Sequence, residues 1–247
     1  MTLYHGGRHS TNALARAIWQ DRNAMVSFAD APNSQVEIAF AVGREVIFDN
    51  GAFSVWRQGI SIDWADFYRW VNRWRRPALR YVLIPDVIDG GEPDNDALLR
   101  SCPLPRWMQL PVWHLHESID RLKRLRDDYE RVALGSSGKY RTPGAMAWWG
   151  RMDEAMEVLC DSSGFPLIPF HGLRQQNPAL FAHVPYASAD SAMVSRSIGT
   201  TNWGGCYQNA PDDAKAFALI RTVESAPCAQ QWRGIPRQAD LFGELTA

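Results

Sequence analysis

Residues 46–53 read VIFDNGAF and contain the pattern that decides the fold. Three apolar side chains lead into Asp49, and the Asn-Gly pair that follows is a strong turn former. A short apolar run that ends in polar residues is typical of a buried strand in a parallel sheet. The pattern therefore predicts a β-strand at 46–49 with a polar loop at its carboxyl end.

The same pattern recurs along the chain, with helix-like segments between the apolar runs. Residues 61–75 have apolar side chains at helical spacing behind Ser61 as the N-cap, and 118–129 are similar. Alternating strands and helices predict an α/β protein with a (β/α)8 TIM-type barrel. The predicted strands are 25–28, 46–49, 81–86, 108–114, 131–135, 167–171 and 184–189, and the predicted helices are 61–75, 118–129, 146–160 and 211–224.

The length of the chain fits one barrel domain. It has 247 residues, of which 46% are hydrophobic, and it contains no linker or internal repeat. Only seven strands are evident, so we expect the eighth within 201–208, where the glycines are equally compatible with an irregular loop. We therefore predict a single compact domain over 1–247.

Charge and cysteine content narrow the class of protein. The formal charge is -1, with 26 basic and 27 acidic residues, so a nucleic-acid site must be a local patch. Four dispersed cysteines neither pair for zinc nor form a disulfide framework. The first residues lack the apolar run of a signal peptide, and no run approaches the roughly 20 apolar residues of a membrane span. We expect a soluble protein of the cytoplasm, or of the host cytoplasm if the source is viral.

Polar residues follow the predicted strands one after another. In parallel barrels the functional side chains lie at the carboxyl ends of the strands, so these residues are the first candidates for a site. Three of them are carboxylates, which converge on one rim if the strands are correct. The strand-end residues are Asp49, Asp86, His114, Gly135 with Ser136, His171 with Gly172, and Asp190.

Two carboxylates at one rim suit the cleavage of a glycosidic bond. Cleavage with retention uses one carboxylate as nucleophile at the anomeric carbon and a second group to move protons, and Asp190 and Asp49 are the natural pair. Asp86 would accept hydrogen bonds from the N–H edge of a purine-like ring. Gly135 and Gly172 would let the backbone approach such a ring closely.

Five short motifs, FDNGAF, IPDV, VALGSSG, FHGL and YASADS, occur in the order of the strand-end motifs of tRNA-guanine transglycosylases. The chain resembles this family over roughly residues 25 to 200, and more closely its DNA-modifying relatives of viruses and bacteria. The resemblance implies Asp49 as general acid/base, Asp190 as nucleophile and Asp86 as the guanine-recognising acid. It further implies ring stacking on Phe53 and base contacts from Gly135 and His114.

The chain departs from the tRNA enzymes at its carboxyl end, where it lacks their cluster of zinc-binding cysteines and histidine. The resemblance therefore favours DNA over tRNA as the polymer. It implies an enzyme that replaces guanine in DNA by a 7-deazaguanine derivative through a covalent aspartyl-glycosyl intermediate. The cycle is ping-pong and needs no cofactor and no metal.

Further residues are expected to contact the substrate after the target nucleotide turns out of its stack. Ser136, His171 and Gly172 would contact the base, and tryptophans in polar surroundings would stack on exposed bases. The candidate cations for phosphate contacts are Lys139, Arg141 and Arg196, and the candidate tryptophans are Trp56, Trp148, Trp149 and Trp203. The basic runs 73–76 and 121–126 are interpreted as solvated faces of outer helices.

Other interpretations stay open. Asp49 and Asp86 would serve equally as turn residues, and Asp190 as a helix N-cap. His114, His116 and His171 with an acid would suit a metal-dependent barrel hydrolase. The chain would also suit a tRNA-acting enzyme, or a non-catalytic nucleic-acid-binding module of barrel form.

Overall fold

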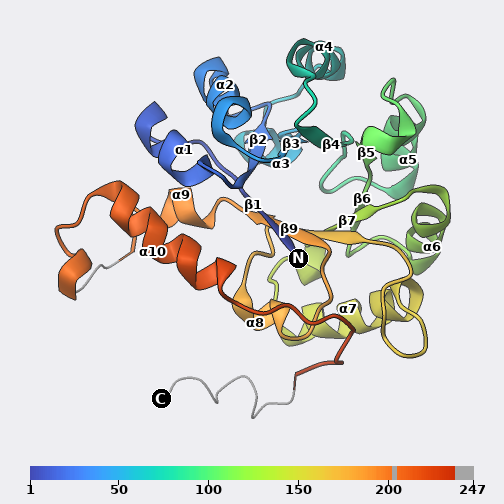
Figure 1. Cartoon of the computed structure of the whole chain (residues 1–247). Helices are drawn as coiled ribbons and strands as arrows, with labels where there is room; N and C mark the ends of the chain where they lie inside the picture. The colour runs from blue at the N-terminus through green and yellow to red at the C-terminus, as the bar shows by residue number, and fades with distance from the viewer. Residues whose placement is uncertain (202–204, 237–247) are drawn as a thin grey trace.

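The computed structural model describes residues 1–201 and 205–236 and contains alternating strands and helices (Figure 1). The strands are β1 Thr2–His5, β2 Asn23–Ser27, β3 Val46–Asp49, β4 Leu79–Leu83, β5 Gln109–Leu110, β6 Val112–His114, β7 Val132–Gly135, β8 Phe170–Leu173 and β9 Ser188–Ser191. The helices are α1 Asn12–Trp19, α2 Asn33–Val42, α3 Ala52–Gln58, α4 Trp64–Trp74, α5 Glu92–Arg100, α6 Ile119–Asp128, α7 Met146–Leu159, α8 Pro178–Phe181, α9 Met193–Ser197 and α10 Asp212–Glu224. Single 3-10 turns occur at Arg106–Met108, Gly138–Tyr140 and Gly205–Tyr207.

The strands form one parallel sheet in the order β5-β4-β3-β2-β1-β9-β8-β7-β6. The two outermost strands are halves of one extended segment, which is interrupted at Pro111 because proline has no backbone N–H to donate. On one side Ile84 N–H donates to the Leu110 carbonyl at 3.1 Å, and on the other Ala133 N–H donates to the Pro111 carbonyl at 2.8 Å. The fold is therefore a TIM-type barrel, as predicted.

One strand lies where the sequence did not indicate it. β1 pairs with β2 and with β9, and Tyr4 lies opposite Asp190 in the register. The prediction of an eighth strand within 201–208 is wrong, because 205–207 form a 3-10 turn, while 202–204 lie outside the described residues. The four residues TLYH are too short and too mixed in polarity to stand out, and pairing on both sides makes them a strand.

Several element boundaries also differ from the predictions. β8 begins three residues after the predicted start, because Leu167 of the apolar run is 54% exposed and the less apolar segment FHGL is the buried one. α4 begins at Trp64 with Asp63 as its N-cap, not Ser61. The predicted α6 is confirmed, with the Ser118 hydroxyl accepting from Arg121 N–H at 3.1 Å.

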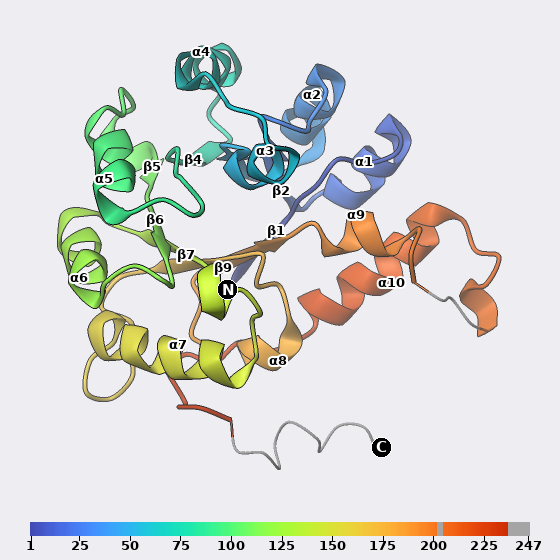
Figure 2. The ribbon, with the colours of Figure 1, turned by 180° about the vertical axis from the view of Figure 1, so that it is seen from behind.

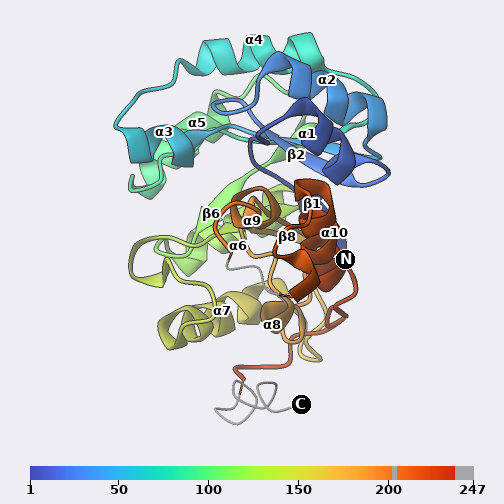
Figure 3. The same cartoon turned by 90° about the vertical axis from the view of Figure 1, so that its left-hand side faces the viewer.

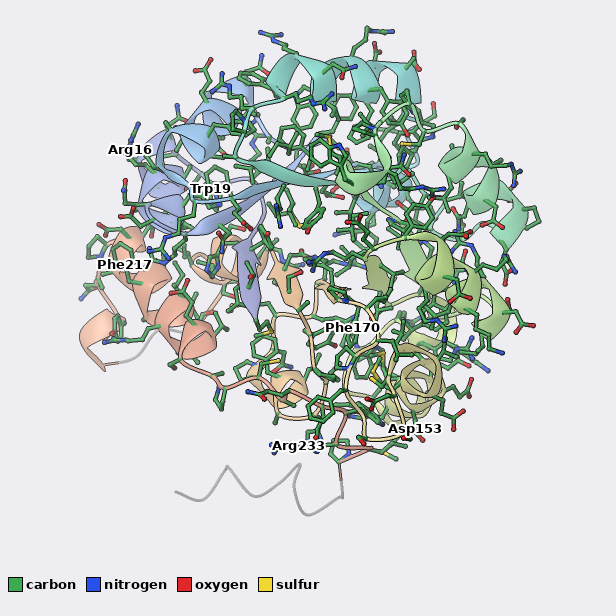
Figure 4. All side chains as sticks on the ribbon, turned by 45° about the vertical axis from the view of Figure 1, so that its right-hand side comes forward. Arg16, Trp19, Asp153, Phe170, Phe217 and Arg233 are labelled. Carbon is green, nitrogen blue, oxygen red and sulfur yellow. The ribbon has the colours of Figure 1, made fainter. Side chains whose placement is uncertain are left out.

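The core has an inner and an outer layer. Inside the barrel, side chains from successive strands meet, among them Tyr4, Met25 and Ile47. Between the strands and the helices lie larger clusters that contain fully buried Trp19 and Phe170. Figure 4 shows these two side chains inside the ring of helices, whereas Arg16 lies at its edge.

The helices surround the strands, and α5, α6 and α7 follow one another along one side (Figures 1 and 2). α10 packs against α1 and α9, and the chain then runs past α8 and α7. There Ala229 N–H donates to the Phe181 carbonyl at 2.7 Å, and the Trp232 indole donates to Asp153 at 3.1 Å. None of the helices within the described ranges combines the length and the apolar character needed to cross a bilayer.

Candidate active site

A cavity of about 350 Å³ opens at the carboxyl ends of the strands. α3 lies at this end of the barrel, away from the chain's amino terminus (Figure 3). All three predicted carboxylates, Asp49, Asp86 and Asp190, line the cavity. Five further predicted residues line it as well, namely Phe53, His114, Gly135, Ser136 and Arg196. The expectation that residues at the carboxyl ends of the strands meet therefore identified residues that line one cavity, even though the eighth strand was predicted in the wrong place.

Asp190 is buried in β9 and held by two hydrogen bonds to the same oxygen. Its Oδ1 lies 3.1 Å from His171 Nε2 and accepts from the backbone N–H of Arg174 at 3.0 Å. Its Oδ2 receives no hydrogen bond from residues 1–201 or 205–236. One oxygen is thus fixed by the protein while the other is available to a molecule in the cavity. Asp190 lies within a strand, so the N-cap interpretation does not apply.

His171 and Gly172 are buried and do not line the cavity, so their placement does not support the prediction that they contact substrate. The His171 ring is 1% exposed and uses Nδ1 toward the Ser188 hydroxyl, at 2.8 Å, and Nε2 toward Asp190. A Cβ atom at Gly172 would lie 2.7 Å from the Tyr186 ring. Gly172 therefore serves close packing, and His171 positions Asp190.

Asp49 ends β3, next to a turn that its neighbours form. The Asn50 side chain accepts from Ala52 N–H at 2.7 Å, and Gly51 has φ +80°, a conformation that favours glycine. Asp49 itself accepts a long hydrogen bond from Gly51 N–H, at 3.3 Å. The turn function therefore belongs mainly to Asn50 and Gly51, which leaves the Asp49 carboxyl facing the cavity.

The environment of Asp49 favours its protonated form. Burial, the largest cause, and the charges of Asp190 and Asp86 raise the pKa of Asp49, the Gly51 amide and the Ser27 hydroxyl lower it, and the resulting pKa is about 7. A carboxyl group with this pKa exchanges protons readily near neutral pH. The charge of Asp190 raises the pKa of Asp49, and both carboxylates line the same cavity.

The raised pKa of Asp49 predicts a pH-dependent stability. Between the ordinary value of 3.8 and about 7, the folded protein binds the proton that the unfolded chain has lost. The free energy of unfolding is therefore expected to fall as pH rises through this window, by up to about 1.4 kcal/mol per pH unit from this group. Denaturant unfolding from about pH 4.5 to 7.5 measures it, and Asp49→Asn should lack this contribution. An identical pH dependence in both proteins would contradict the assignment.

Asp86 forms a hydrogen-bonded unit with two neighbours. Its Oδ2 lies 2.7 Å from His114 Nε2, and its Oδ1 accepts from the Asn50 side chain at 2.7 Å. Asn50 also donates to the Ile84 carbonyl at 2.8 Å, which ties the unit to the end of β4. Both Asp86 oxygens thus already have protein partners. A bound ring would share or replace one of these partners, and the recognition role of Asp86 stays a prediction.

The buried ion pair of Glu117 and Arg121 holds the backbone of His114 in place. Glu117 accepts from the His114 backbone N–H at 2.8 Å and from Arg121 at 2.6 Å. Arg121 also donates to the Val112 carbonyl at 2.9 Å, and the Glu117 and Arg121 side chains are each 1% exposed. These hydrogen bonds fix the end of β6 and thereby the ring that holds Asp86.

Arg174 is a site residue that the sequence did not reveal. It follows β8 with φ +56°, which is unusual for a residue with a side chain, and its N–H bonds Asp190. Its Cζ lies 3.7 Å from the centroid of the Phe53 ring. Burial lowers the pKa of Arg174, whereas the charges of Asp190 and Asp49 raise it. The side chain thus supplies a cation beside the carboxylates and stacks on the predicted base-stacking ring.

Four arginines surround the mouth of the cavity. Arg8, Arg57, Arg174 and Arg196 all line it, and within the described part of the chain none has a carboxylate within 4 Å. Lys139 and Arg141, the other predicted phosphate contacts, do not line the cavity, so their prediction as site cations is not supported by their placement. The order of residues in the sequence does not show which loops after the strands line the mouth of the cavity.

The β1–α1 turn brings one of these arginines against α9. Gly7 has φ +98°, and a Cβ atom there would lie 2.3 Å from the Ser195 hydroxyl. The Ser195 hydroxyl in turn donates to the Gly6 carbonyl at 3.3 Å. Only glycine permits this approach, so the turn with Arg8 sits directly on the helix that carries Arg196.

The predicted tryptophans have different locations. Trp148 and Trp149 are buried, at 0% and 1% exposure, so the prediction that they stack on substrate bases is wrong. The Trp148 indole instead donates to the Ser136 hydroxyl at 3.0 Å and holds that cavity residue. Trp56 on α3 is 46% exposed, with its ring 5.8 Å from that of Phe53. Trp203 lies outside the described residues.

The histidines of the alternative metal site do not form one cluster. His116 bonds the Ser137 hydroxyl and the Gly90 carbonyl, and its ring stacks on His114 at 5.7 Å. His171 lies on another strand with both ring nitrogens engaged. Among the residues that the structure describes, no group of three His, Cys, Asp or Glu side chains is arranged to hold a metal ion.

Comparison with known proteins identifies the fold alone. No family model matches the chain, and no curated protein matches it. Two solved structures of tryptophan synthase from M. tuberculosis are similar in fold. The first, a ligand-free mutant form, has a TM-score of 0.51 at 11% identity, over 91% of this chain and 92% of that chain. The second, an open form with a bound ligand, has a TM-score of 0.50 at 13% identity over the same shares.

Proposed function

We propose that the protein is a DNA base-exchange enzyme that replaces guanine by a 7-deazaguanine derivative. One observation supports this most strongly. Asp190 is anchored through one oxygen with the other available, and it faces the same cavity as Asp49, whose pKa is about 7. A fixed nucleophile and a proton carrier in one cavity are what two-step glycosyl transfer requires.

The first step breaks the bond between guanine and the sugar. Asp190 Oδ2 attacks the anomeric carbon and forms an ester as the carbon–nitrogen bond to guanine breaks. Protonated Asp49 gives its proton to the departing base, so the base leaves neutral. Near pH 7 a large fraction of Asp49 is protonated for this role.

The second step reverses the first with a different base. The incoming 7-deazaguanine base gives the proton of its ring nitrogen to Asp49, that nitrogen attacks the anomeric carbon, and the ester bond to Asp190 breaks. Two inversions give net retention of configuration. The atoms of the two bases and the sugar balance without a nucleotide triphosphate and without electron transfer.

The walls of the cavity suit a flat, polar ring. Phe53 offers an aromatic face. Arg174 covers this face in the structure, and a bound base would stack on it instead. The hydrogen-bonded unit of Asp86 and His114 offers carboxylate oxygens to ring N–H groups. The volume of about 350 Å³ lies within the usual range of small-molecule sites, roughly 300–1,000 Å³.

The arginines at the mouth favour a polymeric substrate. Arg8, Arg57 and Arg196 are exposed and present guanidinium groups around the opening of a cavity whose own groups are acidic. Phosphates on either side of an extruded nucleotide would meet them there. The exposed ring of Trp56 on α3 offers a stacking surface to a neighbouring base.

A pair of charge-removing variants tests the role of the mouth. Arg57→Gln combined with Arg196→Gln is expected to raise KM for DNA about tenfold or more while kcat changes little, because phosphate contacts act in binding. Lys139→Gln combined with Arg141→Gln removes the same charge outside the cavity and should change KM less than about twofold. Steady-state exchange kinetics measure both. Equal effects of the two pairs would contradict a specific role for the mouth.

The reaction itself is tested by incorporation of labelled guanine or a labelled 7-deazaguanine base into DNA and, separately, into tRNA. Label in DNA alone is expected. Label in tRNA alone would identify the other polymer. No label in either, with candidate partner proteins also supplied, would refute the proposed function.

A further inference from the structure

A second concentration of arginines lies at the end of the barrel opposite the cavity. These residues precede or begin β4, β5 and β7, and in a parallel barrel the starts of the strands share one end. We call this surface the amino-end arginine face. Its members are Arg73, Arg75, Arg76, Arg80, Arg106 and Arg131.

Aromatic rings link these arginines into one surface. Arg73 and Arg76 both lie over Trp74, each at 5.3 Å, and Arg75 lies over Trp107 at 5.8 Å. Arg106, beside Trp107 in the chain, lies 4.1 Å from the ring of Tyr129. Two residues further along the chain, Arg131 shares the ring of Tyr81 with Arg80, at 4.7 and 5.3 Å. Cations and rings thus alternate from α4 across to the start of β7.

The charges of this face are almost uncompensated. In the described chain its one ion pair joins Arg80 to Glu45 at 3.9 Å, and Glu45 is shared with the Tyr4 hydroxyl. The basic run on α6 provides the contrast, because every cation there has a carboxylate partner: Arg121, Lys123, Arg124 and Arg126 pair with Asp or Glu. The two runs look alike in sequence, yet only that of α6 matches the expectation of a neutralised outer face.

We propose that the amino-end arginine face binds a nucleic-acid strand, separately from the cavity. Guanidinium groups that lie over rings can still donate N–H groups to phosphate oxygens. Trp107 is 53% exposed and can stack on a base. Trp74 and Tyr129 are buried and hold guanidinium groups in place, which leaves Trp107 to stack on a base while the arginines contact phosphates. A second contact with the same polymer would retain the enzyme on a long substrate between exchange events.

The experiment compares two triple variants in the full chain. One carries Arg75→Gln, Arg76→Gln and Arg106→Gln on the face, and the control carries Lys123→Gln, Arg124→Gln and Arg126→Gln on α6. Both remove three positive charges. Circular dichroism and thermal unfolding establish that each variant is folded. Binding of a fluorescent single-stranded oligonucleotide of about 40 nucleotides is measured by anisotropy over a range of salt concentrations.

The face variant is expected to bind about tenfold more weakly near 0.1 M salt, and its slope of log K against log salt should shrink by about 2. The control should stay within about twofold of the wild type. Unchanged affinity in the face variant, or an equal loss in the control, would overturn the proposal. The measurement does not involve base exchange and can be made in an Asp190→Asn background, so it stands or falls separately from the proposed function.

Discussion

Asp190→Asn is expected to lower kcat for base exchange by about 10⁴-fold or more, because the carboxylate forms the covalent bond to the sugar. Asparagine has nearly the same shape, and its carbonyl can still accept the Arg174 N–H that bonds Oδ1 in the wild type. The substitution therefore removes the nucleophile while it leaves the wall of the cavity in place.

The assay for this variant is the rate at which labelled guanine enters a DNA oligonucleotide. Asp120→Asn is a matched control, because Asp120 is an exposed residue of α6 that pairs only with Lys123 within the described chain, at 3.1 Å. The control should exchange at the wild-type rate, and the Asp190 variant should still bind DNA. A loss of less than about tenfold in Asp190→Asn would exclude a covalent role for this residue.

Asp49→Asn is expected to lower exchange by about 10²- to 10⁴-fold, the range found when a general acid/base is removed. Asparagine cannot supply the proton that guanine needs to leave or accept the proton of the incoming base. Asn50 and Gly51 would still form the turn, through the hydrogen bond to Ala52 and the left-handed glycine. The loss should therefore be one of kcat, with little change in DNA affinity.

The pH dependence distinguishes this role from a structural one. Removal of guanine needs protonated Asp49, and activation of the incoming base needs ionised Asp49, so wild-type kcat should be highest near pH 7, where burial places the pKa. Below this pH the second step should limit the rate, and above it the first. The residual activity of Asp49→Asn should lack this maximum. A maximum that persists in the variant would assign the titration to another group.

The strand-end residues show what the sequence could predict. Asp49, Asp86 and Asp190 follow or end apolar segments, and the regular geometry of parallel strands brings such positions to one rim wherever the exact boundaries fall. This is why three carboxylates could be assigned to one site although β9 begins later than predicted. Its partner β1 was missed because four residues of mixed polarity carry too little pattern.

Residues whose roles depend on tertiary contacts could not be predicted. Arg174 acts through a left-handed backbone and a stack on Phe53, and neither has a sequence signature. His171 ends an apolar run, as the residues that line the cavity do. Its buried side chain nevertheless bonds Asp190 and does not line the cavity. Trp148 stands in a polar segment, but the packing of α7 on the barrel buries it.

The sequence also could not distinguish arginines that have carboxylate partners from arginines that lack them. The runs at 73–76 and 121–126 have similar composition, and only the folded chain shows that carboxylates of α5 and α6 neutralise the second run. At the mouth, Arg57 of α3 lines the opening, whereas Lys139, three residues beyond the cavity residue Ser136, does not.

The central claim is a covalent bond between Asp190 and the sugar of the target nucleotide, and intact-protein mass spectrometry tests it directly. The enzyme is mixed with a guanine-containing DNA oligonucleotide without an incoming base, denatured, and analysed. We predict a species heavier by the oligonucleotide less guanine, mapped to Asp190 by proteolysis and absent in Asp190→Asn. Release of guanine without such an adduct, or an adduct on another residue, would contradict the account.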